Sequence, residues 1–362
     1  MPSDPPSPPF GVVPSACPWK VGLDIGASTA AIDQARAGPE ALRLTRAVIP
    51  ARIAYPTDGG AKAAPAAPFS IGEEALRARD QALLIAPLSP PAILPPARRA
   101  GILLDFADGL RRVLGGGDVR PWGVVAVPRD SEDVARRARS IGREVFDRVL
   151  FVEDHLLAAM ALLDGAADRS AILVDIGARG VRASLAGGGA ILHRSVQPFG
   201  GEAVEAELRR LLRKSCPQLA LTDSTIARMK EHLGFVAPAR RKATIRLVLG
   251  GAERTIDVSE SMRQACEVQV PAILQAVRDL LSRSHARFSS GFQENIFLFG
   301  GGASMPGFPE RIQAELERAG HPQAIVHRVE KPDGLIALGA LKWALATPDR
   351  AWESAFSTRP AA

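Results

Sequence analysis

The chain has 362 residues, of which 46% are hydrophobic and 23% charged, and its formal net charge is +6. This length and apolar fraction are typical of about two globular domains with buried cores, which excludes a wholly disordered or fibrous protein. No apolar run approaches the roughly 18 residues needed to cross a bilayer, so an integral membrane protein is excluded as well.

The N-terminus and the cysteines indicate a cytoplasmic protein without a disulfide framework. Residues 1–18 are rich in proline and lack the basic and apolar regions of a signal peptide, so we expect a disordered lead there. Cys17, Cys216 and Cys266 are odd in number and far apart, which favours packing thiols over disulfides or a zinc site.

The basic residues fall in short runs, at 136–139, 209–214 and 240–242. These runs lie in or beside helix-like stretches, and they lack the interleaved aromatic residues of single-strand binders. We interpret them as solvated helix faces and expect no specific nucleic-acid partner.

Apolar strands alternate with amphipathic helices in the first half of the chain. A strand, a glycine-containing turn and a second strand are expected over 19–35, and a proline-rich loop over 87–96. Further on, the pattern predicts a helix over 101–115, a strand over 122–128, a helix over 131–146 with Ser131 as N-cap, a strand over 148–154 and a helix over 155–165. This alternation predicts an α/β domain with a largely parallel sheet.

The strand-turn-strand pattern restarts at Ser170. The tetrapeptide Asp-Ile-Gly-Ala occurs at 24–27 and again at 175–178, each time after an apolar strand, which indicates two domains of similar plan. Further on we expect helices over 204–216 and within 221–235, the second capped by Thr222, Asp223 or Ser224, and then a hairpin over 243–259. One long helix, kinked at Pro271, is expected over 260–288. A strand, a glycine loop and a helix follow over 295–316, and a last helix over 332–346.

Three loops have the composition of phosphate cradles, at 24–29, 175–180 and 299–304. Glycine lets a backbone approach an anion closely, and successive amides in a turn attract negative charge. Asp24 and Asp175 would repel phosphate directly, so we expect them to hold a hydrated Mg²⁺. The patterns of Rossmann and P-loop nucleotide sites are absent. Two acidic hairpins and a third glycine loop therefore predict a nucleotide held between two domains.

Together these motifs resemble the actin, Hsp70 and sugar-kinase superfamily, and within it the bacterial actins of the MreB and MamK branch, with MamK nearest. The resemblance covers about residues 20–346, and the segments that carry it are VPRDSEDVARRA, FVEDHLLAAMALL, ILVDIGA, FGGEAVEAELRRLL, TIARMKEHLG and FLFGGGASMPGFPERIQ. It implies an α/β, actin-like fold of two duplicated domains around a central nucleotide cleft, each with a smaller inserted subdomain. The implied divisions are a lead over 1–18, domain I over 19–165 with an insert over about 45–98, domain II over 166–346 with an insert over about 203–285, and a tail over 347–362.

The resemblance implies a filament-forming cytoskeletal protein that hydrolyses ATP slowly and positions an organelle or other intracellular structure, as in magnetosome alignment. Its cofactors would be ATP or ADP with Mg²⁺, and its partner further copies of itself. The proline-rich lead does not favour an amphipathic membrane helix, which leaves an adaptor protein to tether the filament to an organelle or vesicle. Two alternatives stay open: a nucleotide-binding scaffold with little hydrolysis, and a small-molecule kinase of the same superfamily.

The resemblance also assigns residues to roles. It places Glu153 and Asp175 in catalysis, where Glu153 would orient the attacking water, and it places Asp24 and Asp175 at Mg²⁺. The phosphates would contact Asp24, Gly26, Ala27 and Ser28 in the first hairpin and Gly177, Ala178 and Arg179 in the second. Gly201 and Glu202 would lie near the ribose, Ala227, Lys230 and Glu231 beside the adenosine, and Gly300, Gly301, Gly302 and Ser304 in the adenosine loop. Arg179 departs from the family pattern, which has a small residue there. Its side chain either binds the γ-phosphate or blocks the usual pose of the nucleotide.

Overall fold

The computed structural model describes residues 17–38, 41–56, 69–78, 82–115, 117, 119–164, 169–215, 217, 221–237, 239–249, 252–283, 295–353 and 356–357. All but the last two residues of the predicted lead, and Cys216, lie outside this part of the chain. The chain divides into two compact units. Unit 1 comprises residues 1–162 and 336–362, and unit 2 comprises residues 163–335.

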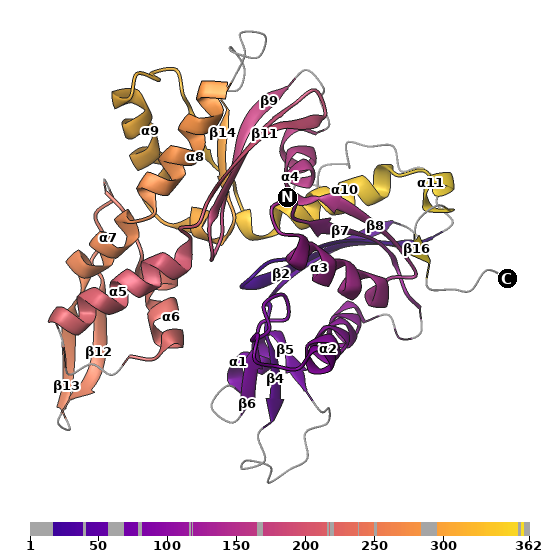
Figure 1. The fold of residues 1–362 in the computed structure, drawn as a ribbon, viewed down its shortest axis with the longest axis horizontal. Coiled ribbons are helices and arrows are strands. Elements are labelled where there is room, and N and C mark those ends of the chain that lie inside the picture. Colours follow the sequence, from indigo (N-terminus) through magenta and orange to yellow (C-terminus); the bar gives the residue numbers. More distant parts are fainter. Residues whose placement is uncertain are drawn as a thin grey trace, which may run out of the picture. The chain divides into compact units, whose positions relative to one another are not determined.

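Unit 1 is built on a six-stranded sheet of order β16-β8-β7-β1-β2-β3 (Figure 1). Strands β8, β7 and β1 are parallel, whereas β2, β3 and β16 pair antiparallel with their neighbours. A separate three-stranded sheet, of order β5-β4-β6, lies within the predicted insert. The strands are β1 (Trp19–Ile25), β2 (Thr29–Ala37), β3 (Leu42–Pro50), β4 (Ile53–Pro56), β5 (Ser70–Ile71), β6 (Ala82–Ile85), β7 (Trp122–Val127), β8 (Arg148–Glu153) and β16 (Phe356–Ser357).

The helices of unit 1 begin and end at the signals that the sequence provides. In α3, Ser131 caps the N-terminus as predicted, because its Oγ accepts a hydrogen bond from the Val134 amide. Helix α2 begins with Pro96 and ends at Gly115 in the left-handed conformation. The helices are α1 (Gly72–Arg77), α2 (Pro96–Leu114), α3 (Glu132–Val145), α4 (Asp154–Leu163), α10 (Leu335–Ala346) and α11 (Asp349–Glu353).

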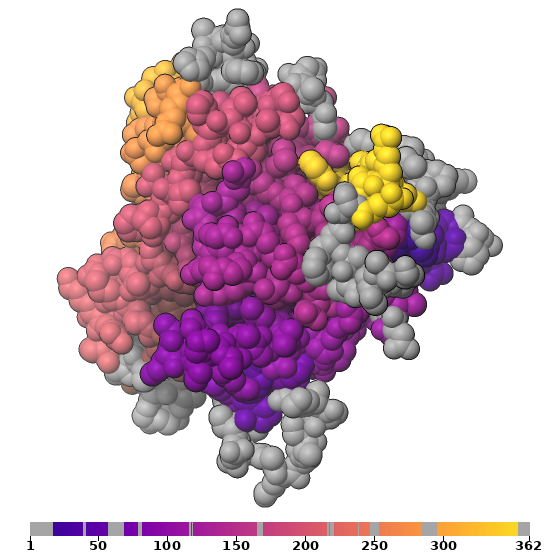
Figure 2. Space-filling view, turned by 45° about the vertical axis from the view of Figure 1, so that its right-hand side comes forward, coloured from indigo at the N-terminus to yellow at the C-terminus, as the bar shows by residue number. Residues whose placement is uncertain are grey.

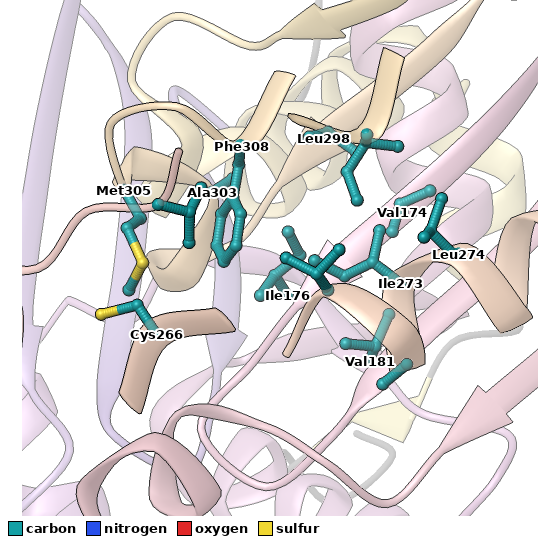
Figure 3. Packing of buried hydrophobic residues seen from close by; sticks show 14 of the residues in the cluster. Val174, Ile176, Val181, Cys266, Ile273, Leu274, Leu298, Ala303, Met305 and Phe308 are labelled. Atoms are coloured by element: carbon teal, nitrogen blue, oxygen red, sulfur yellow. The ribbon is translucent and has the colours of Figure 1, made fainter. Parts of the chain in front are cut away.

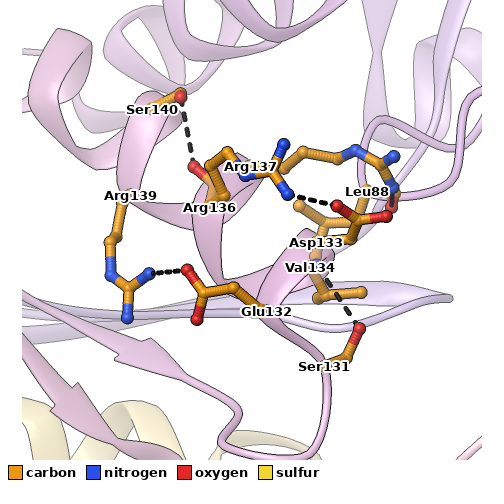
Figure 4. Close-up of polar contacts among 9 residues, drawn as sticks. All are labelled: Leu88, Ser131, Glu132, Asp133, Val134, Arg136, Arg137, Arg139 and Ser140. Carbon is orange, nitrogen blue, oxygen red and sulfur yellow. Dashed lines mark hydrogen bonds and ion pairs between the residues drawn. The ribbon is translucent and has the colours of Figure 1, made fainter.

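The basic run on α3 forms local contacts (Figure 4). Arg136 pairs with Asp133, and Arg139 Nη1 lies 2.8 Å from Glu132 Oε1 on the same helix. Arg137 Nη1 donates to the carbonyl oxygen of Leu88 at 2.7 Å, so it fixes the proline-rich loop before α2. These arginines therefore neutralise neighbouring carboxylates and hold a loop, in agreement with the interpretation of this run as a helix surface.

Helix α10 belongs to unit 1, although it lies inside the predicted domain II. Gly22 of β1 makes room for this helix, because a Cβ atom there would overlap the backbone of Ala337 and Leu341. Gly339 of α10 likewise lies directly against the Leu157 carbonyl of α4. The sequence order places α10 at the end of domain II, but these close contacts attach it to unit 1.

The described part of the predicted tail also packs on unit 1. Trp352 of α11 is fully buried, and the centroid of its ring lies 5.4 Å from the centroid of the Trp122 ring. The buried Nζ of Lys20 lies over both rings, and burial lowers the pKa of this lysine. Strand β16 pairs with β8 at the edge of the sheet. Figure 2 shows this C-terminal segment, in yellow, on the surface beside magenta residues.

Unit 2 contains a five-stranded sheet of order β11-β10-β9-β14-β15, in which β9, β14 and β15 are parallel (Figure 1). The predicted hairpin is present as β12 and β13, which pair only with each other. The strands are β9 (Ser170–Ile176), β10 (Val181–Gly187), β11 (Ala190–Gln197), β12 (Thr244–Leu249), β13 (Ala252–Asp257), β14 (Ile296–Phe299) and β15 (Val326–Arg328). The helices are α5 (Gly201–Ser215), α6 (Asp223–Leu233), α7 (Ser259–Glu267), α8 (Val270–Arg283) and α9 (Phe308–Arg318), with 3-10 turns η2 (Gly301–Ser304) and η3 (Pro332–Gly334).

The long helix predicted over 260–288 is instead two helices. Helix α7 ends at Glu267 and α8 begins at Val270, so Pro271 lies in the first turn of a new helix rather than at a kink. This position suits proline, because the first amides of a helix have no partner within it. Residues 284–288 of the prediction lie outside the described part of the chain. Of the three candidate caps for α6, Thr222 is the one that accepts the capping bond.

The core of unit 2 packs α8 and α9 onto the sheet, and α7 joins the same core through its contacts with α5 and α8 (Figure 3). Val174 and Ile176 of β9 lie among Ile273 of α8 and Phe308 of α9, and all four side chains are completely buried. Among the described residues, no helix is both long and apolar enough to span a bilayer.

Cys266 belongs to this core, and burial raises the pKa of its thiol to about 11. Only the thiolate attacks alkylating reagents, so we expect iodoacetamide at about pH 8 to modify Cys266 very slowly in the folded protein. Half-buried Cys17 is the internal control and should react faster. Peptide mass spectrometry before and after urea unfolding tests this. Equal labelling rates for the two cysteines in native protein would contradict the burial of Cys266.

Candidate functional site

The first predicted phosphate hairpin joins β1 to β2. The Gly26 amide donates to the Thr29 carbonyl at 2.8 Å, and Asp24 lies opposite Ala31 in the strand register. Arg52 Nη1 donates to the Ala27 carbonyl at 2.7 Å. Because the C=O and N–H of a trans peptide point in opposite directions, the Ser28 amide points away from Arg52. The hairpin therefore has a fixed backbone, in which the Ser28 amide is turned away from Arg52.

The second hairpin, between β9 and β10, repeats this geometry. The Gly177 amide donates to the Gly180 carbonyl at 3.0 Å, and Asp175 lies opposite Arg182. In each hairpin the aspartate faces the residue seven positions later, and the glycine two positions after the aspartate closes the turn. The predicted repeat of the Asp-Ile-Gly-Ala motif is therefore confirmed at the level of backbone pairing.

The N-terminus of α5 lies against the second hairpin. The Gly201 amide donates to the Gly177 carbonyl at 3.0 Å, and the Glu202 amide donates to the Ala178 carbonyl at 2.7 Å. These bonds satisfy helix amides that have no partner within α5. They also turn the two hairpin carbonyls toward α5, so the amides that follow them, including that of Arg179, point away from the helix. The exposed Arg179 side chain lies at the tip of this hairpin.

The predicted adenosine loop packs on the same hairpin. Gly300 has a φ of +84°, and a Cβ atom there would overlap Asp175 Oδ1. A Cβ atom on Gly302 would overlap the Ile176 side chain. Glycine at both positions therefore lets the loop lie directly on the end of β9, while Ser304 remains exposed.

Lys230 of α6 reaches the N-terminal turn of α5. Its Nζ lies 2.5 Å from Glu205 Oε1, and a Cβ atom on Gly201 would lie 2.8 Å from the same nitrogen. Of the other residues predicted on α6, Ala227 is half-buried and Glu231 is exposed. Unit 2 thus brings the second hairpin, the N-terminus of α5 with Gly201 and Glu202, the predicted adenosine loop and Lys230 into one cluster.

Glu153 ends β8 in unit 1. Because β8, β7 and β1 are parallel neighbours, Glu153 and the first hairpin lie at the same, carboxyl edge of the sheet. This edge is where α/β sheets bind ligands. The Glu153 side chain is 13% exposed, and its Oε2 lies 3.9 Å from Arg129 Nη1.

Asp175, which the sequence analysis predicts in catalysis and at Mg²⁺, contacts two other groups of the protein. Its Oδ2 accepts a hydrogen bond from Arg182 Nη2, and its Oδ1 lies against Gly300. Mg²⁺ is bound through carboxylate oxygens that remain open to its water shell. Among the described residues, no group of three or more His, Cys, Asp and Glu side chains is placed to hold a metal ion.

Three residues near these loops were not predicted. Arg182 lies seven positions after Asp175, so the register of a tight hairpin was a usable signal for it. Arg52 reaches the first hairpin from outside the motif and has no signal in the local sequence. Asp333 of η3 lies near the adenosine loop, since its Oδ1 is 3.8 Å from the position that a Cβ atom on Gly301 would take. Burial raises the pKa of this carboxyl.

Comparison with known proteins places the chain in a family. The sequence pattern described as MreB/Mbl protein matches residues 108–347, which is more than half of the chain. The chain belongs to the MreB/Mbl family. The duplicated α/β plan and the predicted bacterial-actin resemblance agree with this membership.

Relatives of this MreB/Mbl chain include proteins named actin-like protein MamK. The one from Paramagnetospirillum magneticum is 24% identical over 350 residues, covering 92% of this chain and 94% of that protein. The one from Magnetospirillum gryphiswaldense is 25% identical over 152 residues, or 42% of each protein. Among solved structures, a MamK double helical filament aligns with a TM-score of 0.77 at 21% identity, covering 91% of this chain and 99% of that one. A non-polymerising MamK mutant bound to AMPPNP aligns with a TM-score of 0.64 at 22% identity, covering 90% and 98%. These structural likenesses show the actin-like fold.

Proposed function

We propose that the chain is an ATP-binding bacterial actin-like protein that assembles into cytoskeletal filaments in the cytoplasm. The observation that carries the proposal is the pair of identically closed Asp-Ile-Gly-Ala hairpins, each at the carboxyl edge of its sheet. Backbone amides turned outward from such hairpins suit the oxygens of a polyphosphate. The family membership and the filament formed by a MamK structural relative support the assembly part of the proposal.

In this proposal the predicted residues other than Asp175 bind the nucleotide or act on it. The hairpins at 24–28 and 177–179 bind the phosphates, and the first residues of α5, Gly201 and Glu202, lie by the ribose. Residues 300–302 and 304, with Ala227, Lys230 and Glu231, hold the adenosine. Glu153 orients the attacking water, and hydrolysis is slow because catalysis consists mainly of positioning.

Filament assembly follows from head-to-tail contacts, since a heterologous interface that does not close produces an open polymer. We propose that the filament positions an intracellular structure through an adaptor protein, as the resemblance to the MamK branch of bacterial actins implies. Family membership favours this function over a small-molecule kinase.

Sedimentation and negative-stain electron microscopy of the full chain test the proposal. With ATP we expect pelleted, double- or single-stranded filaments, and with ADP or no nucleotide mostly unpelleted protein. Replacing Lys230 by alanine removes the cation beside α5 and should weaken ATP binding about tenfold, since one charge-assisted contact is lost. The matched control is Lys214→Ala, at an exposed position on α5. A protein that stays unpolymerised with ATP and phosphorylates a metabolite would overturn the assignment.

A further inference from the structure

The second phosphate hairpin carries a buried ion pair. Asp175 and Arg182 face each other across β9 and β10, and Arg182 Nη2 donates to Asp175 Oδ2. The Asp175 residue is 7% exposed, and the Arg182 side chain is 25% exposed. The guanidinium thus meets the carboxylate within the hairpin while part of it still reaches the surface.

The other carboxylate oxygen of Asp175 is covered as well. A Cβ atom on Gly300 would overlap Oδ1, so this oxygen packs against the bare backbone of the glycine loop. Arg182 thus pairs with one oxygen and the Gly300 backbone packs against the other, so little of the carboxylate is left for the water shell of Mg²⁺. The negative charge of Asp175 is therefore neutralised by a side chain of the protein.

The two hairpins differ in charge at equivalent positions. In the first, Asp24 faces the apolar Ala31, whereas in the second Asp175 faces Arg182. The second hairpin also carries exposed Arg179 at its tip, so it holds two arginines and one aspartate. Guanidinium groups stay charged at all relevant pH values and bind phosphate oxygens in a fixed planar geometry. This hairpin is cationic before any metal ion arrives.

We propose that Arg182 replaces the divalent cation in balancing the charge of Asp175, so that this chain binds ATP without requiring Mg²⁺. The inference rests on the proposed nucleotide binding and specifies how its phosphate site is neutralised. Arg182 cancels the repulsion between Asp175 and the phosphates, and Arg179 with the outward amides then meets the phosphate oxygens. Metal-free ATP carries more negative charge than Mg·ATP, so a cationic hairpin does not disfavour it.

Calorimetric titration of the full chain with ATP, in excess Mg²⁺ and in EDTA, tests the inference. For the natural chain we expect dissociation constants within about threefold of each other. Replacing Arg182 by glutamine restores the repulsion of Asp175, so the affinity in EDTA should fall about tenfold and Mg²⁺ should recover it. The double variant Asp175→Asn, Arg182→Gln also removes the repelling carboxylate, so in EDTA it should bind ATP more tightly than Arg182→Gln does. Arg194→Ala, at an exposed arginine on β11 of the same sheet, is the control and should leave both constants unchanged.

The outcomes separate this inference from the function on which it rests. Binding of the natural chain in Mg²⁺ but not in EDTA overturns the inference and leaves nucleotide binding intact. Binding in neither condition overturns the proposed function and the inference with it. Because the natural chain alone distinguishes these cases, the test holds even if Arg182→Gln folds poorly after losing the partner of a buried charge.

Discussion

Replacing Gly339 by alanine is expected to destabilise the protein by about 3 kcal/mol, because the new methyl group has no space. A Cβ atom at this position would overlap the Leu157 carbonyl, which is backbone of α4 and cannot rotate away as a side chain would. Relief requires α10 to move off α4. We therefore expect a lower thermal midpoint and a lower urea midpoint, measured by circular dichroism.

The matched control is Gly101→Ala on α2. Gly101 also lies within a helix, but no atom lies within 4 Å of a Cβ built there. Alanine has a higher helix propensity than glycine, so this variant should be more stable by about 0.5–1 kcal/mol. Glycine-to-alanine substitution is thus expected to lower the stability at Gly339 and to raise it at Gly101. A Gly339→Ala protein as stable as the natural chain would contradict the close contact between α10 and α4.

The contact at Gly339 also illustrates what the sequence does not reveal about the fold. The apolar periodicity of residues 335–346 predicts a helix, and α10 is present. Its partners, Leu157 and the β1 backbone at Gly22, lie more than 180 and 300 positions earlier. Nothing local distinguishes a glycine required by such a contact from one that ends a turn, so the predicted boundary between domains followed chain order instead.

Local signals were sufficient where the physics is local. Ser131 precedes an amphipathic run and caps α3, and the two Asp-Ile-Gly-Ala motifs close as tight hairpins. Pro271 is compatible with either a helix kink or a helix start. Because α7 ends at Glu267, Pro271 lies at the start of α8. Strands β3 to β6 were not predicted, because they are short or have exposed faces that weaken the apolar pattern.

The candidate site divides in the same way. Backbone features such as the glycines at 177 and 300 follow from motif composition, because close approach requires glycine. The charge balance of the hairpin does not follow from motif composition, because it depends on which side chain faces Asp175 across the hairpin. The prediction that Asp175 is a metal ligand considered the carboxylate alone, whereas in the structure Arg182 lies opposite it and donates to it. Charges in a hairpin are best predicted as cross-strand pairs.

Replacing Glu153 by glutamine is expected to lower the rate of ATP hydrolysis by about 100-fold while ATP affinity stays within about twofold. Glutamine keeps the shape of the side chain at the end of β8 but removes the charge that would orient and deprotonate water. Arg129, whose Nη1 lies 3.9 Å from Glu153 Oε2, remains in this variant. Phosphate release at saturating ATP, together with ATP affinity by calorimetry, measures the two quantities separately.

The control for this variant is Glu132→Gln, which removes an exposed carboxylate paired with Arg139 on α3. This variant changes the net charge of the chain by the same amount but lies outside the predicted site, so it should leave phosphate release unchanged. If filament turnover follows hydrolysis, Glu153→Gln filaments should also persist longer after free ATP is removed, as measured by the loss of pelleted protein with time. Unchanged phosphate release in Glu153→Gln would favour the scaffold alternative, in which nucleotide binding alone sets filament stability. A Glu153→Gln protein that binds ATP tightly, hydrolyses it slowly and keeps its filaments would assign both hydrolysis and turnover to this one carboxylate.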